Sequence, residues 1–406
     1  MKAVYIVDGI RSHIGRVNGI YKNLTAEKLG AAVLKELISR YSMLQVDMIV
    51  AGNAVGTGGN ITRLMALNAG IGENIPAITI DSQCSSGGSS IQIAQSLISQ
   101  GIAQCVIAGG FESVSTQPVR SYHFNDSRYK EGYSQYDCAQ FSPEENSDTA
   151  MLDGAKRVAE KWHFSKTHLD TIALASHQKA SSDKVMELVQ KCIFPISGST
   201  CDESIRHNIT AALLDKTPPI SGVISAGNSS TKNDGAAFVI LCSEEYAYKA
   251  KLTPRATILS SVMAANNPLY SPECAIIAAK KLLAQANLSF EDIHCFEFNE
   301  AFAVINALFI QEYPHLAHRL NPLGGALAYG HPYAASGTII LLHLLESLQS
   351  NQYGICSIAA AGGQGSALLV KKVSTLSTLP RLQGGLFCAS NIVEDNNFLG
   401  IKKGGF

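Results

Sequence analysis

The sequence predicts an α/β fold with two similar halves. Short β-branched runs alternate with helical patterns along most of the chain, and a glycine-rich turn leads into a helix in each half. The 406 residues are 46% apolar, which is enough to fill the cores of two domains of ordinary size.

The first half alternates regularly between strands and helices. Helices are predicted over 29–41 and 89–101, where apolar residues recur near the helical period. The predicted strands are 4–8, 48–53, 77–81 and 105–110. This order favours a largely parallel sheet.

A segment of different composition interrupts this pattern from 118 to 230. It begins with a polar, aromatic stretch that is too poor in aliphatic residues for a core strand, and helical patterns follow. Insertions of this kind are often functional. The alternation resumes over 236–242, 256–263, 272–286, 294–302, 337–348 and 356–370.

The resulting organisation has four parts. An N-terminal half over 1–117 is completed by 231–252, the inserted segment covers 118–230, and a C-terminal half covers 253–372. The last part, 373–406, lacks a sustained period and is predicted to be a tail.

Charge and cysteine usage exclude several classes of function. Thirty-two basic residues against thirty-three acidic ones leave no global field for nucleic acid or an anionic membrane. The ten cysteines show neither a zinc spacing nor a disulfide framework, so no metal site is expected and a reducing compartment fits best.

The sequence shows neither a targeting signal nor a membrane span. The N-terminus does not resemble a signal peptide, and the longest apolar run, 338–345, is too short to span a membrane. The chain is therefore predicted to be soluble and cytoplasmic.

Cys84 is the first candidate for chemistry. In ITIDSQCSSGG a strand ends at a polar turn and a helix begins directly afterwards, so the cysteine lies at or beside a helix N-terminus. The helix dipole there favours an anion, and the thiolate is the reactive form of cysteine. The alternative interpretation is that Cys84 is a small buried residue at the end of a strand, without a catalytic role.

Two further clusters contain polar residues in glycine-rich or apolar surroundings. His331 lies between Gly330 and Pro332 on a turn leading into a helix, where its ring can act as a general base towards a thiol. Asn299 and Glu300 interrupt an apolar segment, so they are either hydrogen-bonded structural groups or parts of a site. A solvated loop histidine is the alternative for His331.

Together these segments resemble the thiolase family over about residues 3–372. The matching blocks, in the order of the family, are VYIVDGIRSHIGRVNG, SQCSSG, AGGFESVSTQP, SAGNSSTKNDGAAFVIL, NEAFA, GGALAYGHPYAASG and GGQGSALLV. The resemblance implies a layered αβαβα fold of two similar halves, with 118–230 as a loop domain over the acyl-CoA site. It also implies dimers or tetramers of the same chain.

The resemblance assigns a role to each candidate. Cys84 would carry the acyl group as a thioester, and His331 would activate it. His331 and a water held by Asn299 would form one oxyanion hole, and the backbone N–H groups of Cys84 and Ala361 would form a second. Ser230 matches a serine that contacts the pantetheine arm of coenzyme A.

One departure from the family concerns its second catalytic cysteine. The last block usually begins Cys-x-Gly-Gly-Gly, and here Ala359 occupies the position of the cysteine that moves a proton at the substrate α-carbon. Cys356 lies three residues earlier, and an odd offset in a strand points its side chain to the opposite face.

A second departure concerns the loop domain. Met151 is retained there, but Leu152, Lys156 and Arg157 replace the residues usual near it.

Three functions therefore stay open. The first is an acetyl-CoA C-acyltransferase acting on 3-ketoacyl-CoA or acetyl-CoA in fatty acid metabolism, with coenzyme A as substrate or product and no other cofactor. The second is a diverged acyltransferase or acyl-CoA hydrolase without Claisen chemistry. The third is a non-catalytic acyl-CoA-binding subunit.

Overall fold

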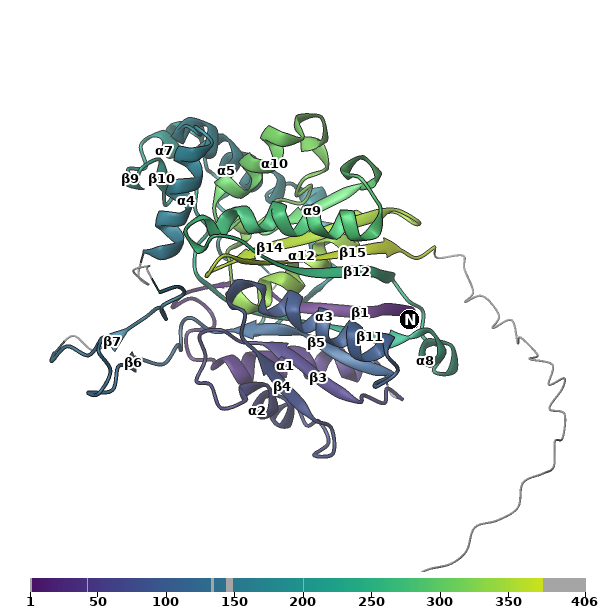
Figure 1. Ribbon diagram of the computed structural model, residues 1–406. Coiled ribbons are helices and arrows are strands. Elements are labelled where there is room, and N and C mark those ends of the chain that lie inside the picture. The colour runs from purple at the N-terminus through teal and green to yellow at the C-terminus, as the bar shows by residue number, and fades with distance from the viewer. Residues whose placement is uncertain (1, 42, 133–134, 144–148, 200, 375–406) are drawn as a thin grey trace, which may run out of the picture. The chain divides into compact units, whose positions relative to one another are not determined.

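A mixed sheet of eleven strands forms the centre of the described chain (Figure 1). The computed structural model describes residues 2–41, 43–132, 135–143, 149–199 and 201–374. The main path of the sheet runs β13 (Cys295–Phe298), β14 (Tyr353–Ala360), β15 (Gln364–Lys372), β12 (Ala256–Ala265), β1 (Val4–Ser12), β11 (Asn233–Ser243), β5 (Cys105–Glu112), β3 (Met48–Gly52) and β4 (Ala77–Ile80). The short strands β2 (Gly15–Arg16) and β8 (Ile193–Phe194) pair with β11 and β1 beside it.

The expectation of a largely parallel sheet is wrong. Neighbouring strands from β14 through β15, β12, β1 and β11 to β5 are all antiparallel. Along the main path, parallel pairing is confined to β13–β14 at one end and β5–β3–β4 at the other. Strands are parallel at the two ends of the sheet because helices connect the successive strands there. In the middle of the sheet the chain reverses direction, through the hairpin between β14 and β15 and through the long segment that leads from β5 to β11.

The predicted layering of helices and strands is confirmed. Two helices, α3 (Ser86–Ser99) and α12 (Tyr333–Ser347), contact strands of both halves of the sheet and lie between them (Figure 1). The outer helices are α1 (Ala26–Ser39) and α2 (Ile61–Asn68) on the N-terminal half, and α9 (Cys274–Ala286) and α10 (Ala303–Glu312) on the C-terminal half. The shorter helices of the two halves are α8 (Glu244–Lys249) and α11 (Ala326–Tyr329).

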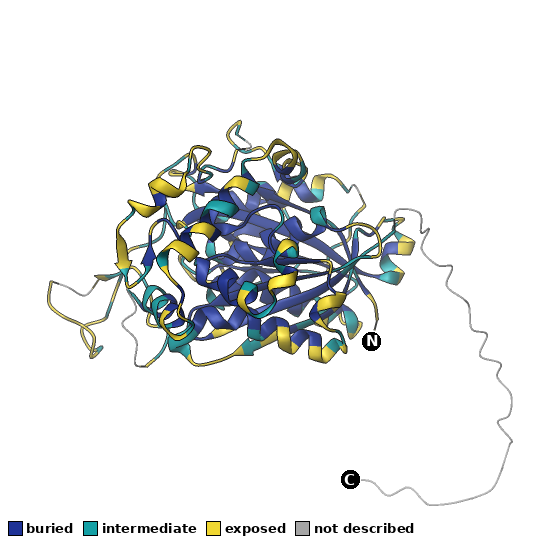
Figure 2. Cartoon of the chain, turned by 90° about the horizontal axis from the view of Figure 1, so that it is seen from above, coloured by how far each residue is buried: buried dark blue, intermediate teal, exposed yellow. Residues whose placement is uncertain are grey.

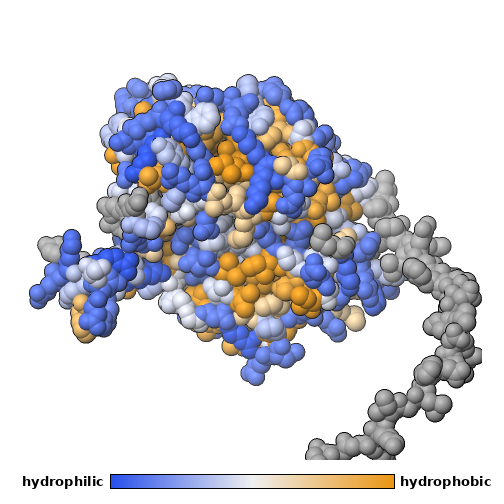
Figure 3. Space-filling model, in the orientation of Figure 1, coloured by the Kyte–Doolittle hydropathy of each residue, from blue (hydrophilic) through white to orange (hydrophobic). Residues whose placement is uncertain are grey.

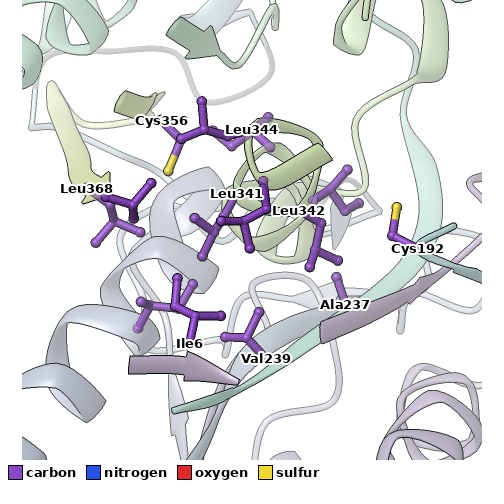
Figure 4. Close-up of a cluster of buried hydrophobic side chains, with 14 of the residues drawn as sticks. Ile6, Cys192, Ala237, Val239, Leu341, Leu342, Leu344, Cys356 and Leu368 are labelled. Atoms are coloured by element: carbon purple, nitrogen blue, oxygen red, sulfur yellow. The ribbon is translucent and has the colours of Figure 1, made fainter. Parts of the chain in front are cut away.

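Helix α12 is apolar on nearly every side because both of its faces are covered. Leu341 and Leu342 lie in the same cluster as strand residues of the N-terminal half, and Leu344 lies near Cys356 of β14 (Figure 4). The buried residues accordingly concentrate in the middle of the described chain, with exposed ones around the rim (Figure 2). A helix without a polar face is the expected sequence pattern for such a central layer.

Glycines allow the N-terminal ends of α3 and α12 to touch. A Cβ on Gly87 would lie 2.5 Å from the carbonyl oxygen of Ala334, and one on Gly337 would lie 2.6 Å from the backbone nitrogen of Gly88. Any larger residue would push the helices apart, because these neighbours are backbone atoms. The contact brings together the turns that carry Cys84 and His331.

The segment 118–230 packs mainly through its helices on the C-terminal half. Helix α5 contacts α10 and α11, and α4 contacts residues 268–273, which form a 3₁₀ helix. Its elements are β6 (Arg120–Ser121), β7 (Gln135–Tyr136), α4 (Ala150–Lys161), α5 (Lys166–Ala180), α6 (Asp183–Gln190), α7 (Ala211–Asp215), β9 (Pro219–Ser221) and β10 (Ile224–Ser225). Its role as a separate loop domain, and the other domain boundaries, stay predictions.

The predicted tail falls almost wholly outside the described residues. Val373 still donates a backbone hydrogen bond of 3.0 Å to Arg255, so the last strand contacts extend one residue beyond β15, and 375–406 are not described. Among the described helices, none has the length and apolar character needed to cross a membrane.

Candidate active site

Cys84 lies on a tight turn between β4 and α3. Residues Gln83–Ser85 form one 3₁₀ turn that runs directly into α3, and Gln83 has a positive φ of 55°. The hydroxyl of Ser86 donates to the carbonyl of Gln83 at 2.6 Å and accepts from the backbone N–H of Ser82 at 2.9 Å. These bonds fix the turn, so the direction of the Cys84 side chain is set by the backbone on both sides.

The thiol of Cys84 is neutral in this structure, contrary to the thiolate expected from its place at a helix start. Burial raises its pKa to about 12, even though backbone N–H groups of Cys84 itself and of Ala361 bond to the sulfur and favour the anion. The carboxylates of Glu112 and Asp81 raise the pKa further. Only 8% of Cys84 is exposed, so desolvation outweighs the helix terminus.

His331 is held rigidly on the turn between α11 and α12. Its backbone N–H donates to the carbonyl of Thr231 at 3.0 Å, and its Nδ1 lies 2.6 Å from the hydroxyl of Ser336. The other ring nitrogen, Nε2, is buried and has no hydrogen-bond partner among the described residues. Burial lowers the pKa of His331 to about 4, so the imidazole is neutral and able to accept a proton.

Asn299 and Glu300 follow β13 and have different surroundings. The backbone of Asn299 bonds to Ser357 on the neighbouring strand at 2.9 Å, while its side-chain Nδ2 is buried without a partner in the described chain. The carboxylate of Glu300 accepts bonds of 2.6 Å from both Ser176 and Asn306, so it joins α5 to α10. Glu300 is therefore a structural group, and Asn299 keeps a donor available.

The turn between β14 and β15 carries the residues at the site of the missing cysteine. Ala361 begins this turn, and the following Gly362 and Gly363 have positive φ values of 78° and 69°. Ala359 packs in the cluster on the α9 side of the sheet, whereas Cys356 packs in the opposite cluster with α12. Cys356 thus faces away from the side that Ala359 occupies.

One cavity of about 370 Å³ collects most of the predicted site residues. Cys84, His331, Ala361, Ser230 and Met151 all line it. Asn299 is not among its lining residues and is 1% exposed. The predicted residues, which are up to 277 positions apart between Cys84 and Ala361, therefore form one constellation rather than separate features.

Two residues at this site were not identified from the sequence. Glu112 ends β5 and accepts backbone bonds from Ala54 at 3.0 Å and Ala334 at 3.4 Å, and burial raises its pKa to about 7. Tyr333 lines the cavity two residues after His331. Glu112 belongs to a quoted family block, but the block alone does not indicate its contact with α12.

Within the described part of the chain, no group of three or more His, Cys, Asp or Glu side chains has the arrangement of a metal site. The groups that line the cavity include a thiol, an imidazole and phenols.

The raised pKa of Cys84 predicts a distinctive pH dependence of alkylation. Iodoacetamide reacts with the thiolate, and a raised pKa lowers the thiolate fraction at any given pH below it. We expect the alkylation rate of Cys84 to rise about tenfold per pH unit from pH 7 to 9 without levelling. Peptide-level mass spectrometry measures the rate at each cysteine separately, and the exposed Cys201 should react faster than Cys84 at pH 7. A plateau at Cys84 below pH 8 would contradict a neutral thiol.

Comparison with known families identifies two adjoining matches. Residues 4–245 match the family model described as thiolase, N-terminal domain, and residues 252–372 match the one described as thiolase, C-terminal domain. These ranges cover both halves and the inserted segment.

Curated relatives and solved structures align over nearly their full lengths. A putative acetyl-CoA C-acetyltransferase, YhfS of Bacillus subtilis, is 34% identical, with 91% of this chain and 99% of the relative covered. The acetyl-CoA acetyltransferase of Allochromatium vinosum is 33% identical, with the same coverage of both chains. The crystal structure of the Acat5 thiolase from Ascaris suum, in complex with coenzyme A, superposes with a TM-score of 0.84 at 32% identity, covering 92% of this chain and all of that one.

Proposed function

Because the chain belongs to the thiolase family and is an acyltransferase of that type, we propose that it carries the acyl group as a thioester on Cys84 and exchanges it with coenzyme A. The observation that supports this most directly is the shared cavity. It contains a buried thiol, an imidazole whose Nε2 has no partner in the described chain, and the Ala361 turn.

Proton transfer from Cys84 to His331 is the first step. Both groups are neutral at rest, so the imidazole takes the thiol proton as the sulfur attacks the thioester carbonyl. The Nδ1 contact with Ser336 orients the ring throughout this transfer. A neutral pair avoids holding a thiolate in a desolvated cavity before the substrate arrives.

Two sets of donors then stabilise the negative oxygen that develops. The backbone N–H groups of Cys84 and Ala361, which bond to the sulfur, would turn to the oxyanion of the acyl-enzyme. The Nε2 of His331 and a water bound by the available Nδ2 of Asn299 would stabilise the negative oxygen that forms at the thioester carbonyl of the incoming acyl-CoA. Removing one oxyanion donor typically costs about 10²–10³ in kcat.

Acyl-CoA and coenzyme A are the proposed substrates and products, with no further cofactor. Ser230 and Met151 lie on the cavity wall, where the pantetheine arm would pass. The Ascaris suum thiolase was crystallised with coenzyme A, and the Bacillus and Allochromatium relatives are named for acetyl-CoA. We propose that the chain acts on acetyl-CoA or a 3-ketoacyl-CoA in fatty acid metabolism, and the acetyl-CoA in the names of these relatives supports the substrate class.

A second candidate function rests on Ala359. An alanine cannot move a proton at the α-carbon, so acyl transfer to water or another acceptor, without Claisen chemistry, is the alternative reaction. A non-catalytic binding subunit is disfavoured, because mere binding of acyl-CoA does not require a thiol and an available imidazole in one cavity.

Two assays on the purified chain test these proposals. Incubation with acetyl-CoA should add one acetyl group in intact-mass analysis, and peptide mapping should locate it on Cys84. Thiolysis of acetoacetyl-CoA by coenzyme A should then proceed if the thiolase reaction is intact. An adduct without thiolysis would select the second candidate, and the absence of both would exclude either enzymatic function.

A homodimer is proposed from the edge of the sheet. Among the described strands, β4 pairs only with β3 and lies at the edge of the sheet. Ile78 and Ile80 of β4 are half-buried, as are Ile93 and Leu97 of α3. The molecular face on which α3 lies carries an apolar area in its lower half (Figure 3). Pairing of two such edges would cover these residues. Light scattering should give twice the mass of the chain or a multiple of it. We also propose a cytoplasmic location, which the free cysteines of the described chain support because thiols stay reduced there.

A further inference from the structure

The missing cysteine at Ala359 raises the question of which other group in the cavity can move a proton. Apart from Cys84 and His331, the titratable side chains on its wall are Asp81, Arg120, Tyr136, Asp137, Cys138, Lys232 and Tyr333. The guanidinium of Arg120 donates a hydrogen bond of 2.8 Å to the carbonyl of Gly56 and has no atom that can accept a proton. Asp81, Asp137 and Lys232 are exposed to solvent, so their charges are not directed at a desolvated reacting centre.

Tyr136 is committed to a neighbouring hairpin. Its ring stacks on Tyr122 with centroids 4.4 Å apart, and both belong to the segment of β6 and β7. Cys138 follows that hairpin and is half-buried. Tyr333 differs from both because it belongs to α12, the helix that also fixes His331.

Tyr333 is held beside the reacting pair by the framework of the fold. Its ring makes an edge contact with His331 at 5.4 Å between centroids and an angle of 77°, and it packs against the cluster that contains Cys84. Its φ is +25°, a conformation that L residues rarely adopt. Such strain in an aromatic residue is retained where the surroundings impose it, and it is typical of functional sites.

The phenol is protonated at neutral pH. Burial raises the pKa of Tyr333, and the nearby Cys84, Cys138 and Glu112 raise it further in their charged forms. A phenol of this kind is a proton donor at rest. After it has given up its proton, the phenolate is a strong base.

On the basis of the proposed function, we propose that Tyr333 transfers the proton at the substrate α-carbon, the role for which the thiolase family uses a cysteine at the position of Ala359. In thiolysis, His331 takes the thiol proton and Cys84 sulfur bonds to the 3-keto carbon. The bond between carbons 2 and 3 then breaks, and its electron pair passes to carbon 2. Tyr333 gives its proton to carbon 2, which releases acetyl-CoA.

The second substrate converts the phenolate of Tyr333 back to the phenol. Tyr333 takes the thiol proton of the incoming coenzyme A, whose sulfur attacks the acyl group on Cys84. The bond from that acyl group to Cys84 breaks, and His331 returns its proton to the sulfur. Each proton and electron pair is thereby accounted for without another reactant.

The experiment compares two reactions of the variant Tyr333→Phe. Exchange of labelled coenzyme A into acetyl-CoA involves Tyr333 only at the thiol of coenzyme A, where water can replace it because a free thiol ionises with a pKa of about 8.5. Thiolysis of acetoacetyl-CoA also requires a proton at the α-carbon, which water does not supply at a comparable rate. We expect thiolysis to fall by about 10²–10⁴ and exchange to fall by less than about tenfold. Tyr313→Phe, which removes a phenol outside the cavity, is the matched control and should change neither reaction.

A rescue variant separates loss of the proton from loss of structure. Adding Ala359→Cys to Tyr333→Phe should restore thiolysis by at least about tenfold, because a thiol then stands where the family has one. Equal losses of exchange and thiolysis in Tyr333→Phe would overturn the proposal, as would thiolysis within threefold of the parent chain. Loss of thiolysis alone in Cys138→Ser would assign the proton to Cys138 instead.

The parent chain itself distinguishes failure of this inference from failure of the proposed function. Acyl exchange without thiolysis would support the proposed Cys84 thioester and refute the role of Tyr333. Absence of the acetyl adduct would refute the Cys84 mechanism and the inference that rests on it.

Discussion

Replacement of Cys84 by alanine is expected to lower the rates of acyl exchange and thiolysis by at least about 10⁴-fold, the order of loss seen when a catalytic nucleophile is removed. In the proposed mechanism the sulfur is the atom that forms the intermediate, and His331 acts as the base and cannot replace it as the nucleophile. Coenzyme A should still bind, because the cavity wall formed by Ser230 and Met151 is untouched. Steady-state kinetics, together with calorimetric titration of coenzyme A, measures both effects.

Cys356→Ala is the matched control for this substitution. Cys356 is a buried cysteine of the same apolar cluster as Cys84, but it does not line the cavity. Either truncation should cost roughly 1 kcal/mol of stability from lost packing, and only Cys84→Ala should abolish turnover. If Cys356→Ala also abolished thiolysis, Cys356 would have to act as the second catalytic cysteine despite its orientation.

The sequence, with the family resemblance, was sufficient to predict the layers, the principal strands and helices, and five residues that share the cavity, whereas the sixth, Asn299, does not line it. The turns around Cys84 and His331 combine local signals, a strand end, glycines and a helix start, which short segments encode directly. Strand direction across the middle of the sheet is not encoded in this way. It depends on which distant strands pair, as β1 does with β11 and β12, and periodicity within a strand is the same for either direction.

The ionisation of Cys84 shows a second limit of local reasoning. A helix start favours the thiolate, but the desolvation that raises its pKa to about 12 comes from residues distant in the chain. Glu112 likewise contacts Ala334 across 222 positions. Tyr333 stands only two residues after His331 in the sequence, yet its positive φ and its place in the cavity become evident only in the folded chain.

Replacement of His331 by alanine is the second change with a very large expected effect. Without a base, Cys84 must lose its proton to solvent from a buried site where its pKa is about 12, so acylation should slow by about 10⁴-fold. Single-turnover formation of the acetyl adduct measures this step directly. His343→Ala is the matched control, because His343 is a buried histidine of α12, the helix that follows His331, and does not line the cavity.

The double variant shows whether Cys84 and His331 act as a unit. Groups that serve one proton transfer lose their effect together, so Cys84→Ala with His331→Ala should be no slower than Cys84→Ala alone. Added imidazole should partly restore His331→Ala, because the truncation opens space beside Ser336, and should not restore Cys84→Ala. Rates that multiply in the double variant would mean that the two residues contribute to separate steps, and the base for Cys84 would then have to be sought elsewhere on the cavity wall.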